Sequence, residues 1–192
     1  FTAETIRARR YYGGKIIPNR GAWLEIETDQ NNVIWVKVDR KRKVAATALL
    51  RAFGVGDDDA IRALFVDANK HPSVDFIEET LKKDTSSNEE EGLIEVYRRI
   101  RPGDLATAEN ARSLIHSMFF NFDRYDLGRV GVYKFQTKFG LDLNEDDYES
   151  KEHRVLSPEK LAHVIAEVIR LNVTQGEPDD IDHLGNRRVR AV

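Results

Sequence analysis

The sequence contains no cysteine. This absence excludes disulfide bonds, thiolate zinc sites and cysteine nucleophiles together, and it fits a reducing compartment. No apolar run approaches the roughly 18 residues that a membrane-spanning helix requires. The first residues, FTAETIRARR, lack the apolar core of a secretion signal. Because the sequence begins without methionine and stops abruptly, we expect it to be a piece of a longer chain.

Familiar catalytic motifs are also missing. The sequence has no phosphate-binding glycine loop, no G-x-S-x-G nucleophile elbow and no H-E-x-x-H zinc motif. It has no aspartate cluster of the kind that holds paired magnesium ions for phosphoryl transfer. We therefore expect this chain not to be catalytic on its own.

The residues that are present describe a globular protein with a charged surface. Hydrophobic residues make up 41% of the 192 residues and charged residues 33%, which suits one ordinary domain or one domain with an appendage. The net charge of -3 implies no global attraction to nucleic acid, but the first fifty and the last six residues are basic. A basic face for a phosphate backbone and a solvated mixed surface both fit this distribution. Charge alone favours the mixed surface.

Hydrophobic periodicity predicts an α+β fold. Residues 14–38 are expected to form strands, because residues 23–28 alternate apolar and polar, DQNN supplies a turn and VIWVKV follows. Helices are expected over 44–54, 57–68, 72–84, 107–120 and 157–172, and within 85–104 before an Arg-Pro-Gly stop. Pro72 and Ser73 are expected to start one helix, and Thr107 and Ser157 to cap two others. Residues 123–140 mix aromatic and basic side chains, and residues 142–156 are expected to form a polar loop. The prediction is a small antiparallel sheet or hairpin beside a mostly helical body.

The segment DDIDHLGNRRVRAV at 179–192 begins with acidic residues and ends with arginines, and each part allows a functional and a structural interpretation. Its carboxylates and His183 could hold a metal, but the other histidines are scattered, so a structural corner is favoured, with Asp179 and Asp180 capping amides or pairing with arginines. The following arginines can contact phosphates and base edges. Structural pairing and nucleic-acid contact both remain open from the spacing alone.

Two features near the predicted hairpin have the same ambiguity. Trp23 lies on a predicted strand, where tryptophan usually belongs to the core, although it can also stack on an unpaired base. The connector DRKRK at 39–43 places four cations in five residues. Arg40, Lys41, Arg42 and Lys43 are either a solvated loop or contacts for backbone phosphates. For Trp23 the residues alone favour the core.

Six long stretches resemble one family, the β subunit of bacterial DNA-directed RNA polymerase. They are IIPNRGAWLEIETD, VKVDRKRKVAATALLRAFG, LIEVYRRIRPGD, TAENARSLIHSMFF, DRYDLGRVGVYKFQTKFGL and DDIDHLGNRRVRAV, which together span nearly the whole chain. The resemblance implies that residues 1–177 form the lobe (β2) domain, with a variable insertion-site loop near 142–156. It implies that residues 178–192 return toward the protrusion domain.

The resemblance also implies a role. The lobe is a noncatalytic jaw of the DNA cleft and contacts the nontemplate strand and downstream DNA. Trp23 would stack on an unpaired nontemplate base. Asp182 would read a flipped guanine, with Ile181 and Arg187 nearby.

The same resemblance implies the partners of the chain. They are DNA, the β′, α and ω subunits and a sigma factor. The assembled enzyme would be a nucleotidyltransferase located in the cytoplasm at the nucleoid. No membrane partner is expected. No cofactor is expected in this segment, because the catalytic magnesium belongs to β′. The alternative is a docking module for transcription factors or phage regulators, for which the acidic middle helices would be suited.

Overall fold

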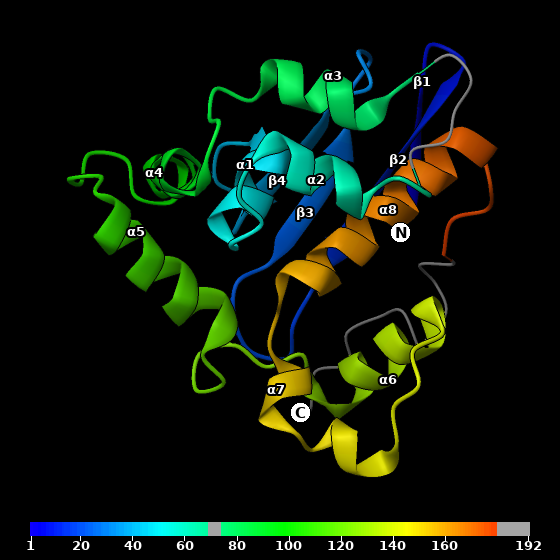
Figure 1. The fold of residues 1–192 in the computed structure, drawn as a ribbon. Coiled ribbons are helices and arrows are strands. Elements are labelled where there is room, and N and C mark those ends of the chain that lie inside the picture. Colours follow the sequence, from blue (N-terminus) through cyan, green and yellow to red (C-terminus); the bar gives the residue numbers. More distant parts are fainter. Residues whose placement is uncertain (69–73, 180–192) are drawn as a thin grey trace.

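The computed structural model describes residues 1–68 and 74–179, and its strands form one antiparallel sheet (Figure 1). The strands are hydrogen-bonded in chain order, so that each pairs with its sequence neighbour. Their bounds are β1 Thr2–Ile6, β2 Arg9–Ile16, β3 Leu24–Thr28, β4 Ile34–Val38 and β5 Val44–Ala45. The predicted hairpin is confirmed as β3 and β4.

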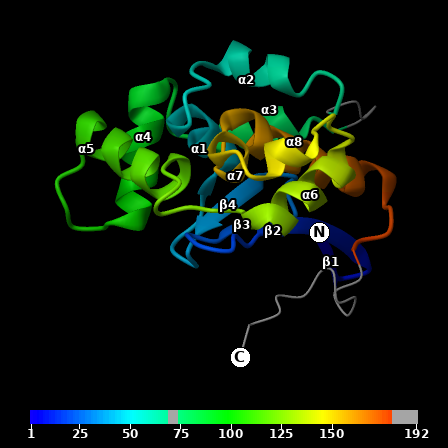
Figure 2. The same ribbon diagram turned by 90° about the horizontal axis from the view of Figure 1, so that it is seen from below.

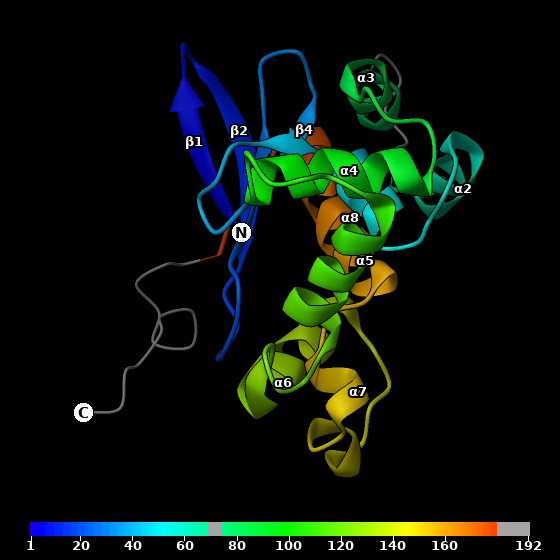
Figure 3. The same ribbon diagram turned by 90° about the vertical axis from the view of Figure 1, so that its left-hand side faces the viewer.

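The sheet buries one face. Leu24 and Ile26 of β3 are buried and lie opposite Val38 and Val36 of β4. The residues between them point to the other side of the sheet, because side chains alternate along a strand. Figure 3 shows the helices gathered on one side of the strands.

Helices and the loops between them form the rest of the described chain, which confirms the α+β prediction. Figure 2 shows α4 and α5 projecting at one end of the molecule. The predicted caps Thr107 and Ser157 accept hydrogen bonds from backbone N–H groups at the starts of α5 and α8. The bounds are α1 Ala46–Ala52, α2 Asp58–Leu64, α3 Phe76–Lys83, α4 Glu89–Ile100, α5 Ala108–Ile115, a π-helical turn His116–Phe120, α6 Gly128–Phe139, a 3₁₀ turn Glu145–Tyr148, α7 Lys151–Arg154 and α8 Pro158–Thr174.

Three local predictions need correction. Strands were expected from residue 14, but β1 and most of β2 precede it. The expected loop at 142–156 contains the 3₁₀ turn and α7, and the aromatic and basic segment, for which no element was predicted, contains α6. The α3 helix begins at Phe76 with Asp75 as its N-cap, whereas Pro72 and Ser73 lie outside the described residues.

An asparagine in α8 fastens this helix to the sheet. Asn172 is 8% exposed, and its amide donates to Thr28 Oγ1 (3.0 Å) and accepts from the backbone N–H of Tyr12 (3.2 Å). The Tyr12 hydroxyl donates to the carbonyl of Gly176 (2.6 Å). The end of α8 is therefore held against β2. No helix in the described ranges is long and apolar enough to cross a membrane.

A buried arginine joins the helices on the covered side. Arg51 of α1 is 1% exposed and donates to the carboxylate of Asp84 (3.3 Å), to the Gly56 carbonyl (3.1 Å) and to Asp58. Asp84 in turn accepts from the hydroxyls of Thr47 (2.6 Å) and Ser86. These bonds satisfy a charged group that would otherwise be costly to bury.

Candidate nucleic-acid interface

Trp23 lies directly before β3, on the face of the sheet away from the helices. Its neighbours Ala22 and Leu24 are buried, whereas Trp23 is only partly buried and does not belong to the hydrophobic core cluster. The alternation of side chains places it on the same face as Glu25. The core interpretation that the residues alone favoured is therefore wrong, because the alternation assigns Leu24 and Ile26 to the core instead.

The 39–43 connector folds back across Trp23. Asp39 and Arg40 adopt left-handed backbone conformations, with φ of 48° and 61°. The Asp39 carboxylate accepts a hydrogen bond from the backbone N–H of Trp23 (2.8 Å), and the backbone N–H of Asp39 donates to the backbone carbonyl of Trp23 (2.9 Å). Both ends of the Trp23 peptide unit are therefore tied to this turn.

Arg40 and Lys43 each lie over a tryptophan ring. The Arg40 guanidinium carbon is 5.3 Å from the Trp23 ring centroid, and the Lys43 ammonium is 4.7 Å from that of Trp35. The Arg40 side chain is 76% exposed and 3.9 Å from the Glu25 carboxylate, a surface pair worth little in stability. The structure thus brings two of the four predicted phosphate-contacting cations beside aromatic rings on the uncovered side.

Lys41 and Arg42 complete this cationic turn. Both are exposed, and neither forms an ion pair with any described residue. An aromatic ring with adjacent cations can hold a base and its phosphates together. The turn therefore places an aromatic ring and exposed cations side by side on the uncovered side of the sheet.

The loop before Trp23 is held in place by Tyr125 and Asp126, which follow the π-helical turn. Arg20 and Asp126 exchange two backbone hydrogen bonds (3.1 and 2.8 Å). Gly21 has φ of 126°, and a Cβ there would lie 2.7 Å from the ring of Tyr125. Tyr125 is fully buried, and burial raises the pKa of its hydroxyl.

Through its carboxylate, Asp126 joins this loop to Arg154 with charged hydrogen bonds. Its carboxylate is 4% exposed, and it accepts two hydrogen bonds from Arg154 (2.8 Å each) and one from the Gly128 N–H (2.7 Å). Burial alone would raise the pKa of Asp126. The hydrogen bonds from Arg154 and Gly128, with the charges of Arg154 and Arg20, outweigh burial and lower it.

We expect Asp126→Asn to lower the free energy of unfolding at pH 7 by about 2–3 kcal/mol, because it removes the closer and more buried of the two carboxylates that pair with Arg154. A carboxylate with a lowered pKa stabilises the fold above its unfolded pKa of about 3.9, and this stabilisation is lost as the pH falls through the folded value. The difference between the native chain and Asp126→Asn should therefore shrink below about pH 4. Urea unfolding between pH 7 and 3 measures it. A difference that stays constant with pH would contradict the pairing.

The remaining predicted DNA contacts, Ile181, Asp182 and Arg187, lie outside the described residues. Asp179 is described, and its carboxylate contacts the ammonium of Lys138 (3.0 Å). Asp179 therefore has a structural partner, although it is not one of the arginines that the sequence suggested.

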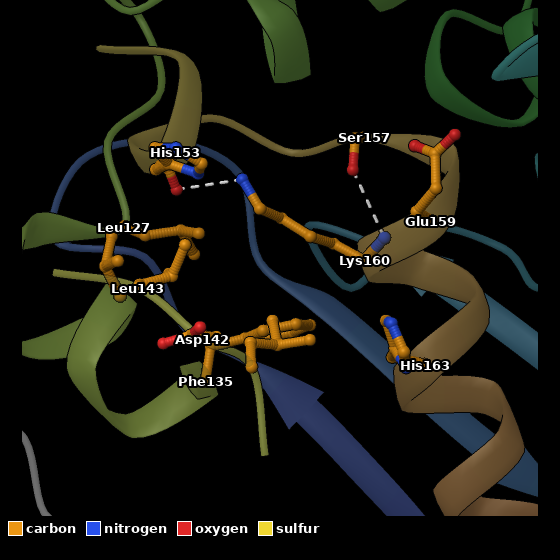
Figure 4. Close-up of a pocket in the computed structure, with 11 residues that line it drawn as sticks. Leu127, Phe135, Asp142, Leu143, His153, Ser157, Glu159, Lys160 and His163 are labelled. Atoms are coloured by element: carbon orange, nitrogen blue, oxygen red, sulfur yellow. Dashed lines mark hydrogen bonds between the residues drawn. The ribbon is translucent and has the colours of Figure 1, made fainter. Parts of the chain in front are cut away.

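A separate pocket of about 350 Å³ lies between α6 and the start of α8 (Figure 4). Leu127, Phe135 and Leu143 line it, with His163 at one side. Burial lowers the pKa of Lys160 to about 8. Its ammonium donates to the carbonyls of Glu152, His153 and Val155. Lys160 therefore closes the end of α7 rather than serving as a free base.

No group of three or more histidine and acidic side chains within 1–68 and 74–179 could hold a metal ion. Sequence reasoning missed the supporting residues Gly21, Tyr125 and Asp126. A glycine shortly before a strand was the one local signal available for Gly21. The pairing of Asp126 with Arg154 had no local signal, because the two residues are distant in the chain.

Comparison with known proteins identifies relatives along the whole chain. A family model described as RNA polymerase Rpb2, domain 2, matches residues 3–190. The DNA-directed RNA polymerase subunit beta of Trichodesmium erythraeum is 44% identical over 193 residues, which cover 100% of this chain and 16% of the relative. The same subunit of Synechocystis sp. is 45% identical over 184 residues, covering 96% of this chain and 16% of the relative. That of Rhodomonas salina is 40% identical over 193 residues, with 100% and 16% covered. The chain spans about 16% of the length of these relatives, and the resemblance to RNA polymerase β subunits is confirmed.

Proposed function

Because the chain belongs to the RNA polymerase Rpb2 domain 2 family, we propose that it is the noncatalytic lobe (β2) of a DNA-directed RNA polymerase β subunit and acts in transcription as one jaw of the DNA cleft. Residues 1–177 form this lobe, with the variable loop near 142–156, and residues 178–192 lead toward the protrusion. The β′, α and ω subunits, the sigma factor and the catalytic magnesium on β′ complete the enzyme, in the cytoplasm at the nucleoid.

The observation that supports this function most strongly is the position of Trp23. A large aromatic side chain lies on the uncovered side of the sheet, with Arg40 over its ring and two further exposed cations in the same turn. Stacking of a base on an aromatic ring contributes about 1–3 kcal/mol and tolerates any base. Trp23 would hold an unpaired base of the nontemplate strand while Arg40, Lys41, Arg42 and Lys43 contact phosphates.

Base identity would be read by the segment that follows α8. In this proposal Asp182 accepts hydrogen bonds from a flipped guanine, Ile181 and Arg187 lie nearby, and another part of the pocket comes from polymerase sequence outside this chain. A carboxylate suits this role because the Watson–Crick edge of guanine presents N–H donors. Trp23 would then contribute affinity for any base, and Asp182 would determine the preference for guanine.

The test is binding of this chain to single-stranded oligonucleotides with and without guanine, measured by fluorescence anisotropy across salt concentrations. We expect weak, salt-dependent binding that Trp23→Ala reduces about 5- to 150-fold, the equivalent of about 1–3 kcal/mol. Asp182→Ala should weaken this binding too, and within an assembled polymerase it should remove the guanine preference. Tyr133→Ala removes an exposed aromatic ring of α6 and serves as the matched control. Affinities unchanged in Trp23→Ala would contradict the stacking role.

A second candidate is a docking surface for transcription factors or phage regulators. Leu64 and Val66, at the end of the acidic helix α2, are 43% and 63% exposed, although they are large and apolar. Exposed apolar groups beside charges are typical of protein contacts. If docking is the main role, Trp23→Ala should leave oligonucleotide binding unchanged, so the same measurement separates the two functions.

A further inference from the structure

Phe122, between the π-helical turn and α6, lies among cations from three parts of the chain. The guanidinium carbons of Arg20 and Arg154 are each 5.3 Å from its ring centroid, and the Lys151 ammonium is 5.4 Å from it. The face of an aromatic ring attracts each cation. The three cations nevertheless repel one another, and a nearby negative charge reduces this repulsion.

The acids of this region are already engaged by other arginines. Asp126 accepts two hydrogen bonds from Arg154. Glu149 pairs with Arg129 (2.8 Å) and with Arg154 (3.5 Å).

The other two cations at Phe122 lack such partners. Neither Arg20 nor Lys151 forms an ion pair with a carboxylate of the described residues. This holds also for Asp123, which is exposed and follows Phe122 directly. The charge of Arg20 acts on Asp126 without a direct ion pair, and Lys151 has no carboxylate within ion-pair distance among the described residues. Both cations lie beside a half-buried aromatic ring. This arrangement suits a ligand that brings its own negative charge.

We infer that Arg20 and Lys151, on either side of Phe122 in the sequence, form a phosphate-binding subsite for single-stranded nucleic acid. The inference rests on the proposed function, because the strand is the one that stacks on Trp23. Arg20 precedes Trp23 by three residues, which is at most about 11 Å of backbone. A single strand can therefore contact both groups.

The subsite is held in place before any ligand arrives. Arg20 is fixed by its backbone pairing with Asp126, and its side chain donates to the Phe122 carbonyl. Lys151 lies in α7, whose end is closed by Lys160. Groups that are already ordered lose less conformational freedom on binding.

The test measures binding of a fluorescein-labelled oligothymidine to the 192-residue chain over a range of salt concentrations. For single strands, each lost phosphate contact reduces the slope of log affinity against log salt by about 0.7. The double variant Arg20→Gln/Lys151→Gln should therefore lose about 1.4 from the slope and bind ~20-fold more weakly at 0.1 M salt. Arg20→Lys/Lys151→Arg keeps both charges and should keep the slope.

The matched control is Lys82→Gln/Arg112→Gln, which removes the same net charge from exposed ion pairs on α3 and α5. If this control lost as much affinity and slope as the Arg20/Lys151 variant, the effect would come from net charge alone, and the subsite would be overturned. An unchanged slope in the Arg20/Lys151 variant, with Trp23→Ala still weakening binding, would overturn the subsite and leave the proposed function standing. If the unaltered chain fails to bind any oligonucleotide, the proposed function fails and the subsite fails with it. Thermal melting of each variant verifies that the fold is retained.

Discussion

Replacing Arg51 with alanine is expected to lower the free energy of unfolding by about 3–5 kcal/mol. Arg51 and Asp84 are each 1% exposed at the side chain, so the substitution leaves a buried carboxylate without its charged partner. The carbonyl of Gly56 loses a donor as well. The hydroxyls of Thr47 and Ser86 remain hydrogen-bonded to Asp84 but cannot neutralise it.

Urea unfolding and thermal melting measure this loss. For a domain of this size the midpoint temperature should fall by about 10 °C. Arg62→Ala is the matched control, because Arg62 pairs with Asp59 and Glu78 at a 44% exposed side chain, where an ion pair contributes little to stability. If Arg51→Ala cost no more than Arg62→Ala, the buried network would not hold the helices together.

Gly21→Ala is expected to lower the free energy of unfolding by about 2–4 kcal/mol and to weaken oligonucleotide binding. The backbone at Gly21 has φ of 126°, which non-glycine residues rarely adopt. The added methyl group would also lie 2.7 Å from the Tyr125 ring and 3.0 Å from the Arg124 carbonyl. Because Trp23 follows two residues later, relief of this clash displaces the proposed stacking surface.

Gly103→Ala separates these two contributions. Gly103 has φ of 93°, but a Cβ there meets no atom within 4 Å, so the substitution measures backbone strain alone. We expect it to cost about 1 kcal/mol and to leave oligonucleotide affinity unchanged. Equal stability losses at Gly21 and Gly103 would show that the contact with Tyr125 carries no energy.

The parts of the fold that were predictable carry strong local patterns. The β3–β4 hairpin has alternating apolar residues around a polar turn, and α8 has a serine cap, a proline at its first position and a buried stripe at Leu161, Val164, Ile165 and Val168. Strand β1 has no such pattern because nearly all of it is exposed and it pairs through its backbone. Helix α6 begins at a glycine with φ of 79° and buries few residues, so its apolar spacing was weak.

The candidate site was predictable only in part. The residues alone placed Trp23 in the core, and the resemblance placed it at DNA. Reading the alternation through Leu24 and Ile26 decides that it lies on the outer face. The support from Gly21, Tyr125, Asp126 and Arg154 depends on contacts between residues far apart in the chain, 28 residues for Asp126 with Arg154 and about a hundred for Gly21 with Tyr125. No local pattern encodes such contacts.

The central claim is that a base stacks on Trp23, and intrinsic fluorescence tests it most directly. The chain has two tryptophans, Trp23 and Trp35, so Trp35→Phe leaves Trp23 as the single indole fluorophore. Adding a single-stranded oligonucleotide should then quench the emission with the same salt dependence as binding. The complementary variant Trp23→Phe, which retains Trp35, should show little quenching. Quenching confined to Trp35, or emission from Trp23 that does not change when the oligonucleotide is bound, would contradict the account.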